Sequence, residues 1–340
     1  MARPAATRQH RGDVTVSSAE PGVQLARIAY FGKLPARADF IKAADHPAVL
    51  KLLDCWLAEV MNALSSDPRW KLHYDALLPL DFVFLGTRRR HAIAGQLRAS
   101  GDRSQRRFPF LCASLIEVAQ ARSFLPMSPM LLAPLWQRLS PLASSVCAAH
   151  DPALPLQLLT AASVEIERST ERQEQCFAVF VEQQTIAALE AMLDSRQVRQ
   201  LILALGLLLQ PVRRSGAERL DKSLVLPLPQ PPVHRMAVAT FWLTLIMPFL
   251  LPADFELCLF IGQQRGRYVL VLGFGGAAPE TLQAIIDPQC AAEQQISFEY
   301  TGWVDELITG DAEAQKLSAY LDQGQLSLRS VISLFQETFH

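Results

Sequence analysis

The sequence predicts an α/β protein whose sheet is mainly antiparallel and is packed against helices. Segments rich in aromatic and β-branched residues alternate with segments whose apolar residues recur at helical spacing. The link between the second and third expected strands is five residues long, shorter than the crossover of about a dozen residues that parallel pairing requires. An antiparallel sheet is therefore favoured over the doubly wound parallel sheet of nucleotide-binding proteins.

The composition is that of a globular protein of about two domains. The chain has 340 residues, 50% hydrophobic and 19% charged, with a mean hydropathy of +0.15, which excludes an intrinsically disordered or collagen-like protein. The net charge of −1 provides no long-range field to attract nucleic acid or anionic lipid, so neither is an expected partner. The six cysteines form no CxxC pair, which favours free thiols and a cytoplasmic location.

The N-terminal part predicts a tail, a strand and a helix. Residues 1–25 contain arginines but no apolar run behind them, which favours a disordered tail over a secretory signal. Residues 26–32 form the first expected strand, which ends at a glycine. Asp45 precedes Pro47 as an N-cap precedes a first-turn proline, and apolar residues at helical spacing extend the expected helix to Leu64.

Three more strands are expected over residues 81–85, 91–97 and 110–118. The link over residues 86–90 is short enough for a hairpin, so the first two of these strands should pair antiparallel. Prolines then punctuate residues 124–155, and we expect the main domain boundary near residues 145–155. The first domain accordingly spans residues 26–145.

Residues 150–340 are expected to form a second α/β region. Its predicted strands and helices are strands over 176–181, 255–261 and 268–274, and helices over 185–209, 280–286, 312–321 and 328–339. A proline-rich connection over residues 227–232 separates the first helices from the later strands.

Residues 236–253 leave two interpretations open. They carry no charge over 18 positions and reach the length of a membrane span. Pro248 and Pro252 divide the stretch, which favours a buried helix up to Met247, a turn across the prolines and then a strand. We therefore expect no stable membrane insertion.

No sequence motif favours an enzyme. The chain lacks a GxxxxGK[ST] phosphate loop, an HExxH zinc helix, a GxSxG elbow and an EF-hand loop. Its seven histidines are scattered singly, so no metal site and no cofactor are expected. Residues 273–276 (GFGG) follow a strand and precede a helix, where backbone amides can cradle a phosphate; the alternative is a simple tight turn.

Charge is concentrated in two segments. Seven arginines and one aspartate lie within residues 86–107, whereas residues 299–340 contain seven acidic residues and two basic ones. The two segments are either solvated faces that attract each other or, for the arginines, a docking site for an acidic or phosphorylated partner.

Two motifs resemble the TagF family, also called ImpM, of type VI secretion accessory proteins. Residues 31–40 (FGKLPARADF) are similar to the family's FGKLPSRGDF, with Ala36 and Ala38 replacing serine and glycine. Residues 100–110 (SGDRSQRRFPF) are similar to its SxDRxGRxFPL, with Gln105 in place of glycine. The resemblance weakens over residues 235–290 and is absent over 150–232.

The resemblance implies a cytoplasmic, non-enzymatic regulator of type VI secretion. Family members are thought to restrain assembly after translation by binding a scaffold with a forkhead-associated domain. The implied fold is an α/β/α sandwich with a mostly antiparallel sheet and a longin-like N-terminal domain. The partner would be that scaffold or another type VI secretion component.

The partner-binding residues are expected in the two motifs. They are Gly32, Lys33, Leu34, Pro35, Arg37, Asp39, Phe40, Asp102, Arg103 and Arg106. The charged residues either form an interaction surface or lock the two loops together, with Lys33 or Arg37 paired to Asp39 or Asp102. Phe108 is expected in the core, and replacing Arg103 and Arg106 by alanine is expected to leave folding intact.

Overall fold

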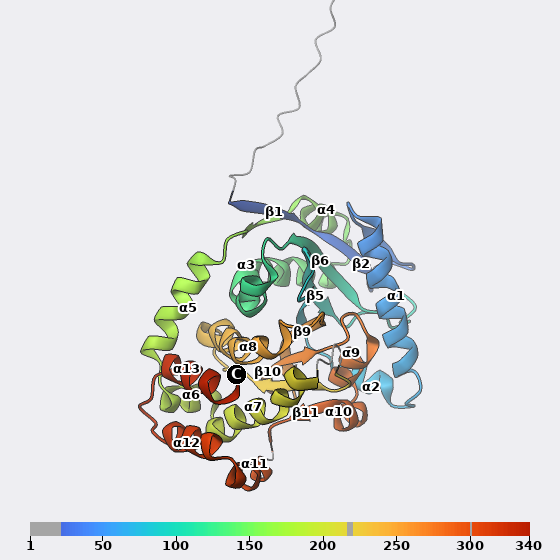
Figure 1. Ribbon diagram of the computed structural model, residues 1–340. Helices are drawn as coiled ribbons and strands as arrows, with labels where there is room; N and C mark the ends of the chain where they lie inside the picture. The colour runs from blue at the N-terminus through green and yellow to red at the C-terminus, as the bar shows by residue number, and fades with distance from the viewer. Residues whose placement is uncertain (1–21, 216–219, 300) are drawn as a thin grey trace, which may run out of the picture.

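The computed structural model describes residues 22–215, 220–299 and 301–340 (Figure 1). Its strands are β1 (Val23–Arg27), β2 (Ala29–Gly32), β3 (Ile41–Ala43), β4 (Leu80–Gly86), β5 (His91–Arg98), β6 (Phe110–Glu117), β7 (Ser163–Glu167), β8 (Ser223–Pro227), β9 (Glu256–Gln264), β10 (Arg267–Gly273) and β11 (Gln295–Ser297). Its longer helices are α1 (Pro47–Leu64), α3 (Ala121–Ala148), α5 (Glu171–Gln183), α7 (Val198–Ser215), α8 (Arg235–Leu250), α12 (Ala312–Leu321) and α13 (Leu328–Phe339). The shorter helices are α2 (Trp70–Asp75), α4 (Ala153–Ala161), α6 (Ile186–Leu193), η1 (Pro232–His234), α9 (Pro279–Ile286), α10 (Pro288–Gln294), α11 (Gly302–Leu307) and η2 (Ile308–Gly310).

One nine-stranded sheet organises the molecule. Its strand order is β11-β8-β10-β9-β4-β5-β6-β2-β3, and every neighbouring pair is antiparallel except β11 with β8. A separate two-stranded ribbon joins β1 to β7. The predicted α/β class with a mostly antiparallel sheet is therefore confirmed.

Helices cover both faces of the sheet, because its central strands bury side chains on both sides. In β4, Val83 and Leu85 point to the core under α3 and α8, while Phe82 and Phe84 point to the core under α1 and α9. Figure 1 shows α1 and α9 on one side of the strands and α3 and α8 on the other. The layers are helix, sheet and helix, as expected for an α/β/α sandwich.

The predicted strands at 81–85, 91–97 and 110–118 are confirmed as β4, β5 and β6, paired as successive antiparallel neighbours. Both terminal helices have the predicted bounds, and the helices predicted over residues 185–209 are α6 and α7. The predicted α1 helix also forms, although its N-cap is His46 rather than Asp45. The expected first strand over 26–32 is divided between β1 and β2.

The structure bears on only part of the predicted tail and does not test the predicted domain boundary. Of the predicted tail over 1–25, residues 1–21 lie outside the described residues, and residues 23–25 belong to β1. The division into residues 26–145 and 150–340 stays a prediction. In the sheet, β4 of the first part pairs directly with β9 of the second, over the register that places Phe82 opposite Phe260.

The proline-rich segment is a helix that the sequence analysis did not predict. Helix α3 contains Pro126, Pro129, Pro134 and Pro141. The last two are exposed and seven residues apart, so they share the solvent-facing side, where the carbonyl groups that they leave unpaired can bind water. Burial of the opposite side, including Trp136, holds the helix against the sheet.

The strand predicted over 176–181 is wrong, because these residues lie in helix α5. Phe177, Phe180 and Val181 are buried at helical spacing, whereas Val179 is exposed. A short run of aromatic and β-branched residues suggested a strand, but burial of one helical side determines the conformation.

The apolar segment at 236–253 forms a helix within the molecule. Residues Pro232–Leu250 are long and apolar enough to cross a membrane, and 61% of the most apolar window is buried inside the protein. Phe241, Trp242 and Leu245 are fully enclosed by the sheet and neighbouring helices. Helix α8 continues to Leu250, three residues beyond the expected end at Met247, with Pro248 inside it.

Candidate functional site

The first motif forms a loop that starts buried and ends exposed. Motif loop 1 (residues 33–40) connects β2 to β3, with Lys33 and Leu34 buried and Pro35 exposed. Gly32, at its start, has φ +136°, and a Cβ there would lie 2.0 Å from the Pro109 carbonyl oxygen. Glycine is therefore required where the two motifs cross.

The second motif forms a tight turn between β5 and β6. Motif loop 2 (residues 99–109) is closed by a bridge between Gly101 and Arg107. Gln105 has φ +61°, the left-handed region that favours glycine, and its N–H donates to the Asp102 carbonyl at 2.8 Å. Gln105 stands where the TagF motif has glycine, and it keeps the left-handed backbone conformation that glycine favours.

Asp102 joins the two motif loops at a buried ion pair. Its Oδ2 accepts from Lys33 Nζ at 3.0 Å and from Arg106 Nε at 2.7 Å, while its Oδ1 accepts from the backbone N–H of Ser104 and Arg106. The Asp102 side chain has no exposed surface, and that of Lys33 is 10% exposed. Burial alone would raise the pKa of Asp102, but the Arg106 N–H, the Lys33 ammonium and the Arg106 guanidinium hold it well below its usual range.

Arginines also tie motif loop 2 to the backbone of motif loop 1. The Arg103 guanidinium donates to the Ala36 carbonyl at 2.9 Å, and its backbone N–H donates to the Arg37 carbonyl at 2.8 Å. Arg106 Nη2 donates to the Ala38 carbonyl at 3.0 Å. Replacing both arginines by alanine would remove these side-chain bonds to motif loop 1, and the expectation that folding stays intact remains a prediction.

Three aromatic rings form a cluster at the end of motif loop 1. Phe40 stacks on Phe31 with ring centroids 5.6 Å apart and meets Phe108 edge-on at 4.8 Å. Lys33 Nζ lies 4.9 Å from the centroid of the Phe40 ring. Phe108 lies in the core, as expected, whereas Phe40 is 43% exposed.

The structure brings all ten expected site residues together but gives them two roles. Gly32, Lys33, Leu34 and Asp102 are buried and hold the loops in place. The others reach the surface: Pro35, Arg37, Asp39, Phe40, Arg103 and Arg106. Arg37 forms an exposed ion pair with Asp151 at 3.6 Å, and Asp39 Oδ1 accepts from the backbone N–H of Phe40.

Helix α2 supports the site through residues that sequence reasoning missed. Tyr74 is buried, and its hydroxyl donates to the Ser100 carbonyl and accepts from the Ser100 N–H, at 2.9 and 3.0 Å. Asp75 accepts both Nε and Nη2 of Arg107, at 2.7 and 2.6 Å. No local pattern links residues 26 and 32 positions apart in the chain, so this support could not be read from spacing.

Among the described residues, no ion pair joins the arginines of residues 86–107 to the acidic residues of 299–340. Arg89 bonds to Glu256, and Arg88 donates to the Pro252 carbonyl. In the C-terminal segment, Asp305 and Asp322 both pair with Arg199. Within the described ranges, the arginine-rich segment and the acidic C-terminal segment therefore form their ion pairs with other parts of the protein. Mutual attraction does not explain their charge.

The GFGG loop is a strand-to-helix turn whose amides are used internally. The Gly276 N–H donates to the Glu256 carbonyl at 2.9 Å, and the Ala278 N–H donates to the Gly275 carbonyl at 3.2 Å. Pro279, the first residue of α9, has no N–H to offer. This geometry favours the simple turn over a phosphate cradle.

Comparison with known proteins identifies the region that contains both motifs. Residues 29–162 match the family described as TagF N-terminal domain, Type VI secretion system-associated. The crystal structure of PA0076 from Pseudomonas aeruginosa PAO1 is similar at 22% identity over 41% of this chain and 64% of that chain, with a TM-score of 0.35, which supports no conclusion. No curated protein matches the sequence.

Proposed function

From the match of residues 29–162 to the TagF N-terminal domain family, which is associated with type VI secretion, we propose that the chain is a regulatory accessory protein of that system. It acts in the cytoplasm without catalysis. It binds a type VI component, a scaffold with a forkhead-associated domain, and holds that component away from assembly as a post-translational repressor.

The observation that supports this proposal most directly is the clamped pair of motif loops. Lys33, Asp102 and Arg106 fix loops that belong to different strands of the sheet. A surface held in one conformation loses little conformational entropy when a partner binds. The matched domain therefore carries a pre-organised surface in the place where its two motifs meet.

Phe40 is the anchor of this surface. Its aromatic side chain is 43% exposed, and the exposed guanidinium of Arg106 binds the Ala38 carbonyl two residues before it; aromatic and arginine residues dominate the binding energy of protein interfaces. Within the described part of the chain, the bonds above use Nη2 of Arg103 and Nε and Nη2 of Arg106. The Nη1 groups are left to bind an acidic or phosphorylated partner surface.

Co-purification tests the proposal. The tagged chain is expressed with its type VI cluster, and captured proteins are identified by mass spectrometry against an untagged control. We expect the scaffold to be enriched with the native chain, and Phe40→Ser to reduce enrichment at least about tenfold, the size of a hot-spot loss. Val179→Ser, at another exposed apolar position, should retain the enrichment.

Two results would contradict the proposal at different levels. Equal capture by Phe40→Ser and the native chain would remove the motif-loop surface from the interface. Failure of the native chain to enrich any type VI component above the untagged control would reject the regulatory function.

A further inference from the structure

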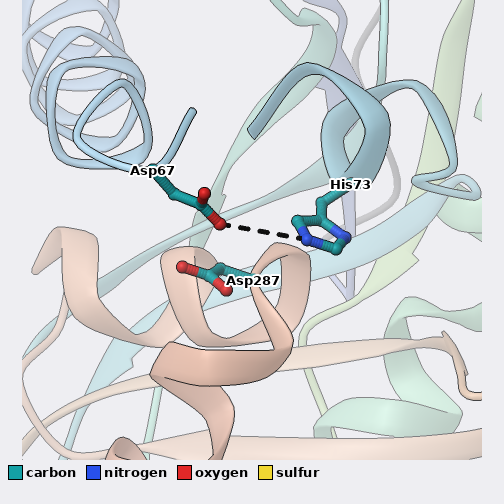
Figure 2. Close-up of side chains that lie close together, drawn as sticks. All are labelled: Asp67, His73 and Asp287. Carbon is teal, nitrogen blue, oxygen red and sulfur yellow. Dashed lines mark ion pairs between the residues drawn. The ribbon is translucent and has the colours of Figure 1, made fainter. Parts of the chain in front are cut away.

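A second group of polar residues lies where the α1–α2 corner meets the α9–α10 corner. Figure 2 shows Asp67, after α1, and His73, in α2, facing Asp287, which lies between α9 and α10. One ligand atom from each residue lies within 4.8 Å of those of the other two. The cluster therefore offers two carboxylate oxygens and one imidazole nitrogen to a common point.

Asp67 has an oxygen that the protein leaves without a hydrogen bond. Its Oδ1 accepts from the Arg69 N–H at 2.9 Å, but its Oδ2 is shielded from solvent and has no hydrogen-bond partner among the described residues. His73 Nε2 lies 4.0 Å from that oxygen, beyond hydrogen-bond distance (Figure 2). An unsatisfied buried carboxylate oxygen is costly unless a cation binds it.

The other carboxylate is also held in place. Asp287 is 9% exposed and caps α10, with Oδ1 accepting from the Gln289 N–H at 2.9 Å. Each aspartate thus has one oxygen bound to a neighbouring backbone N–H, and Asp67 Oδ1 also forms an ion pair with Arg69 Nε at 3.6 Å. Asp67 Oδ2 remains without a hydrogen bond beside His73. Two carboxylates that converge in this way repel each other unless a positive charge lies between them.

We propose that Asp67, His73 and Asp287 bind one divalent transition-metal ion of the Zn²⁺ type. Imidazole nitrogen and carboxylate oxygen are both ordinary zinc ligands, and three protein ligands leave a position for water. Two ligands of a tetrahedral zinc ion lie about 3.3 Å apart, so the 4.0 Å between Asp67 Oδ2 and His73 Nε2 closes with a small side-chain shift.

The ion would join two parts of the chain. Asp67 and His73 lie within residues 29–162, and Asp287 lies far outside that range. A metal bound between them stabilises the packing of the α1–α2 corner on the α9–α10 corner, because it binds the folded chain and not the unfolded one. This role is independent of the proposed regulatory function.

Metal retention by the full chain tests the site. The protein is treated with a chelator and dialysed against Zn²⁺, and bound zinc is measured by elemental analysis. We expect His73→Gln to lose one equivalent of zinc, with binding at least about tenfold weaker, the effect of losing even an indirect ligand contact. His150→Gln, an exposed histidine outside the cluster, should retain the native stoichiometry.

A second variant separates metal binding from helix capping. Asp287→Asn keeps a side-chain oxygen that can cap α10 but removes the ligand charge, so it should fold and bind zinc weakly. Because the exposed thiols of Cys55 and Cys176 can also bind zinc, the measure is the difference between each variant and the native chain under identical conditions.

Two outcomes overturn the site. The first is equal zinc affinity and stoichiometry in the native chain, His73→Gln and Asp287→Asn. The second is no zinc retention by the native chain, with His73→Gln lowering the melting temperature regardless of zinc.

Discussion

Two carboxyl groups, Asp102 in motif loop 2 and Asp81 on β4, have pKa values shifted in opposite directions. Asp102 is buried among two cationic side chains and two backbone N–H donors, which hold its pKa well below the usual range. Asp81, on β4, faces the layer of α3 and α8, and burial raises its pKa to about 6. Its Oδ1 accepts from Gln96 Nε2 at 2.7 Å.

The side chains around Asp81 explain the contrast. Asp81 lines a cavity of about 440 Å³ together with Arg235 and Tyr268. Arg235 does not neutralise it, because its guanidinium lies 3.3 Å from the centre of the Tyr268 ring and donates to the carbonyls of Pro229 and Gln230. Cationic partners and hydrogen-bond donors, and not depth alone, determine whether the pKa of a buried carboxyl group rises or falls.

Removing the Lys33 ammonium group from Asp102 should have the largest effect on stability. Lys33→Met removes one of the two cationic side chains that bind Asp102 and leaves the Arg106 guanidinium and the two backbone N–H donors. We expect the melting temperature at pH 7 to fall by roughly 10 °C, as for loss of one partner of a buried pair. The measurement is thermal unfolding followed by circular dichroism between pH 3 and pH 8.

The pH profile distinguishes lost charge pairing from lost packing. In the native chain the lowered pKa of Asp102 gives stability that is present above its ordinary value of 3.8 and is lost as pH falls through the folded-state pKa. Lys33→Met should weaken this acid sensitivity. A uniform decrease at every pH would show that Lys33 contributes only by packing.

Neutralising Asp81 should stabilise the protein, in contrast to the loss of Lys33. Asp81→Asn is expected to raise the free energy of unfolding by about 2–3 kcal/mol at pH 7.5. The folded-state pKa of about 6 lies above the ordinary 3.8, so the native chain loses stability as pH rises between these values. Urea unfolding should show the gain at pH 7.5 and little difference near pH 3.5; a gain of equal size at both pH values would contradict the assignment.

Gln105→Gly should give the smallest effect, by relieving the turn that carries Asp102. A left-handed conformation costs a non-glycine residue about 1–2 kcal/mol, and the greater freedom of glycine in the unfolded chain cancels part of the gain. We expect stabilisation of about 0.5–1 kcal/mol in urea unfolding. Ser104→Gly is the matched control, and it should not stabilise the chain.

Local pattern was enough to predict much of the sheet. The hairpin of β4 and β5 and the helix α1 follow from residue alternation, turn length and helical spacing, which are properties of neighbouring residues. Helix α3 was missed because local propensity counts its four prolines against it, whereas burial of Trp136 and its neighbours stabilises it. The strand prediction over residues 176–181 was wrong because burial of one side of helix α5 also outweighs local propensity there.

The candidate site was predicted as a set of residues but not as an arrangement. Both motifs were recognisable, and Lys33 with Asp102 was one of the pairings left open. The support from Tyr74 and Asp75 lies on a separate helix, and the convergence of His73 with Asp287 spans more than half the chain. Sequence spacing had indicated isolated histidines.

The amino-acid sequence by itself determined the α/β class, the antiparallel succession of β4, β5 and β6 and the TagF motifs, because each rests on short-range periodicity or on contiguous residues. The tertiary structure decided which side of each motif is buried, which carboxyl groups meet cations and which polar groups converge. Those outcomes depend on contacts between segments far apart in the chain, and the free energy of such contacts exists only once the sheet and its two helical layers have formed.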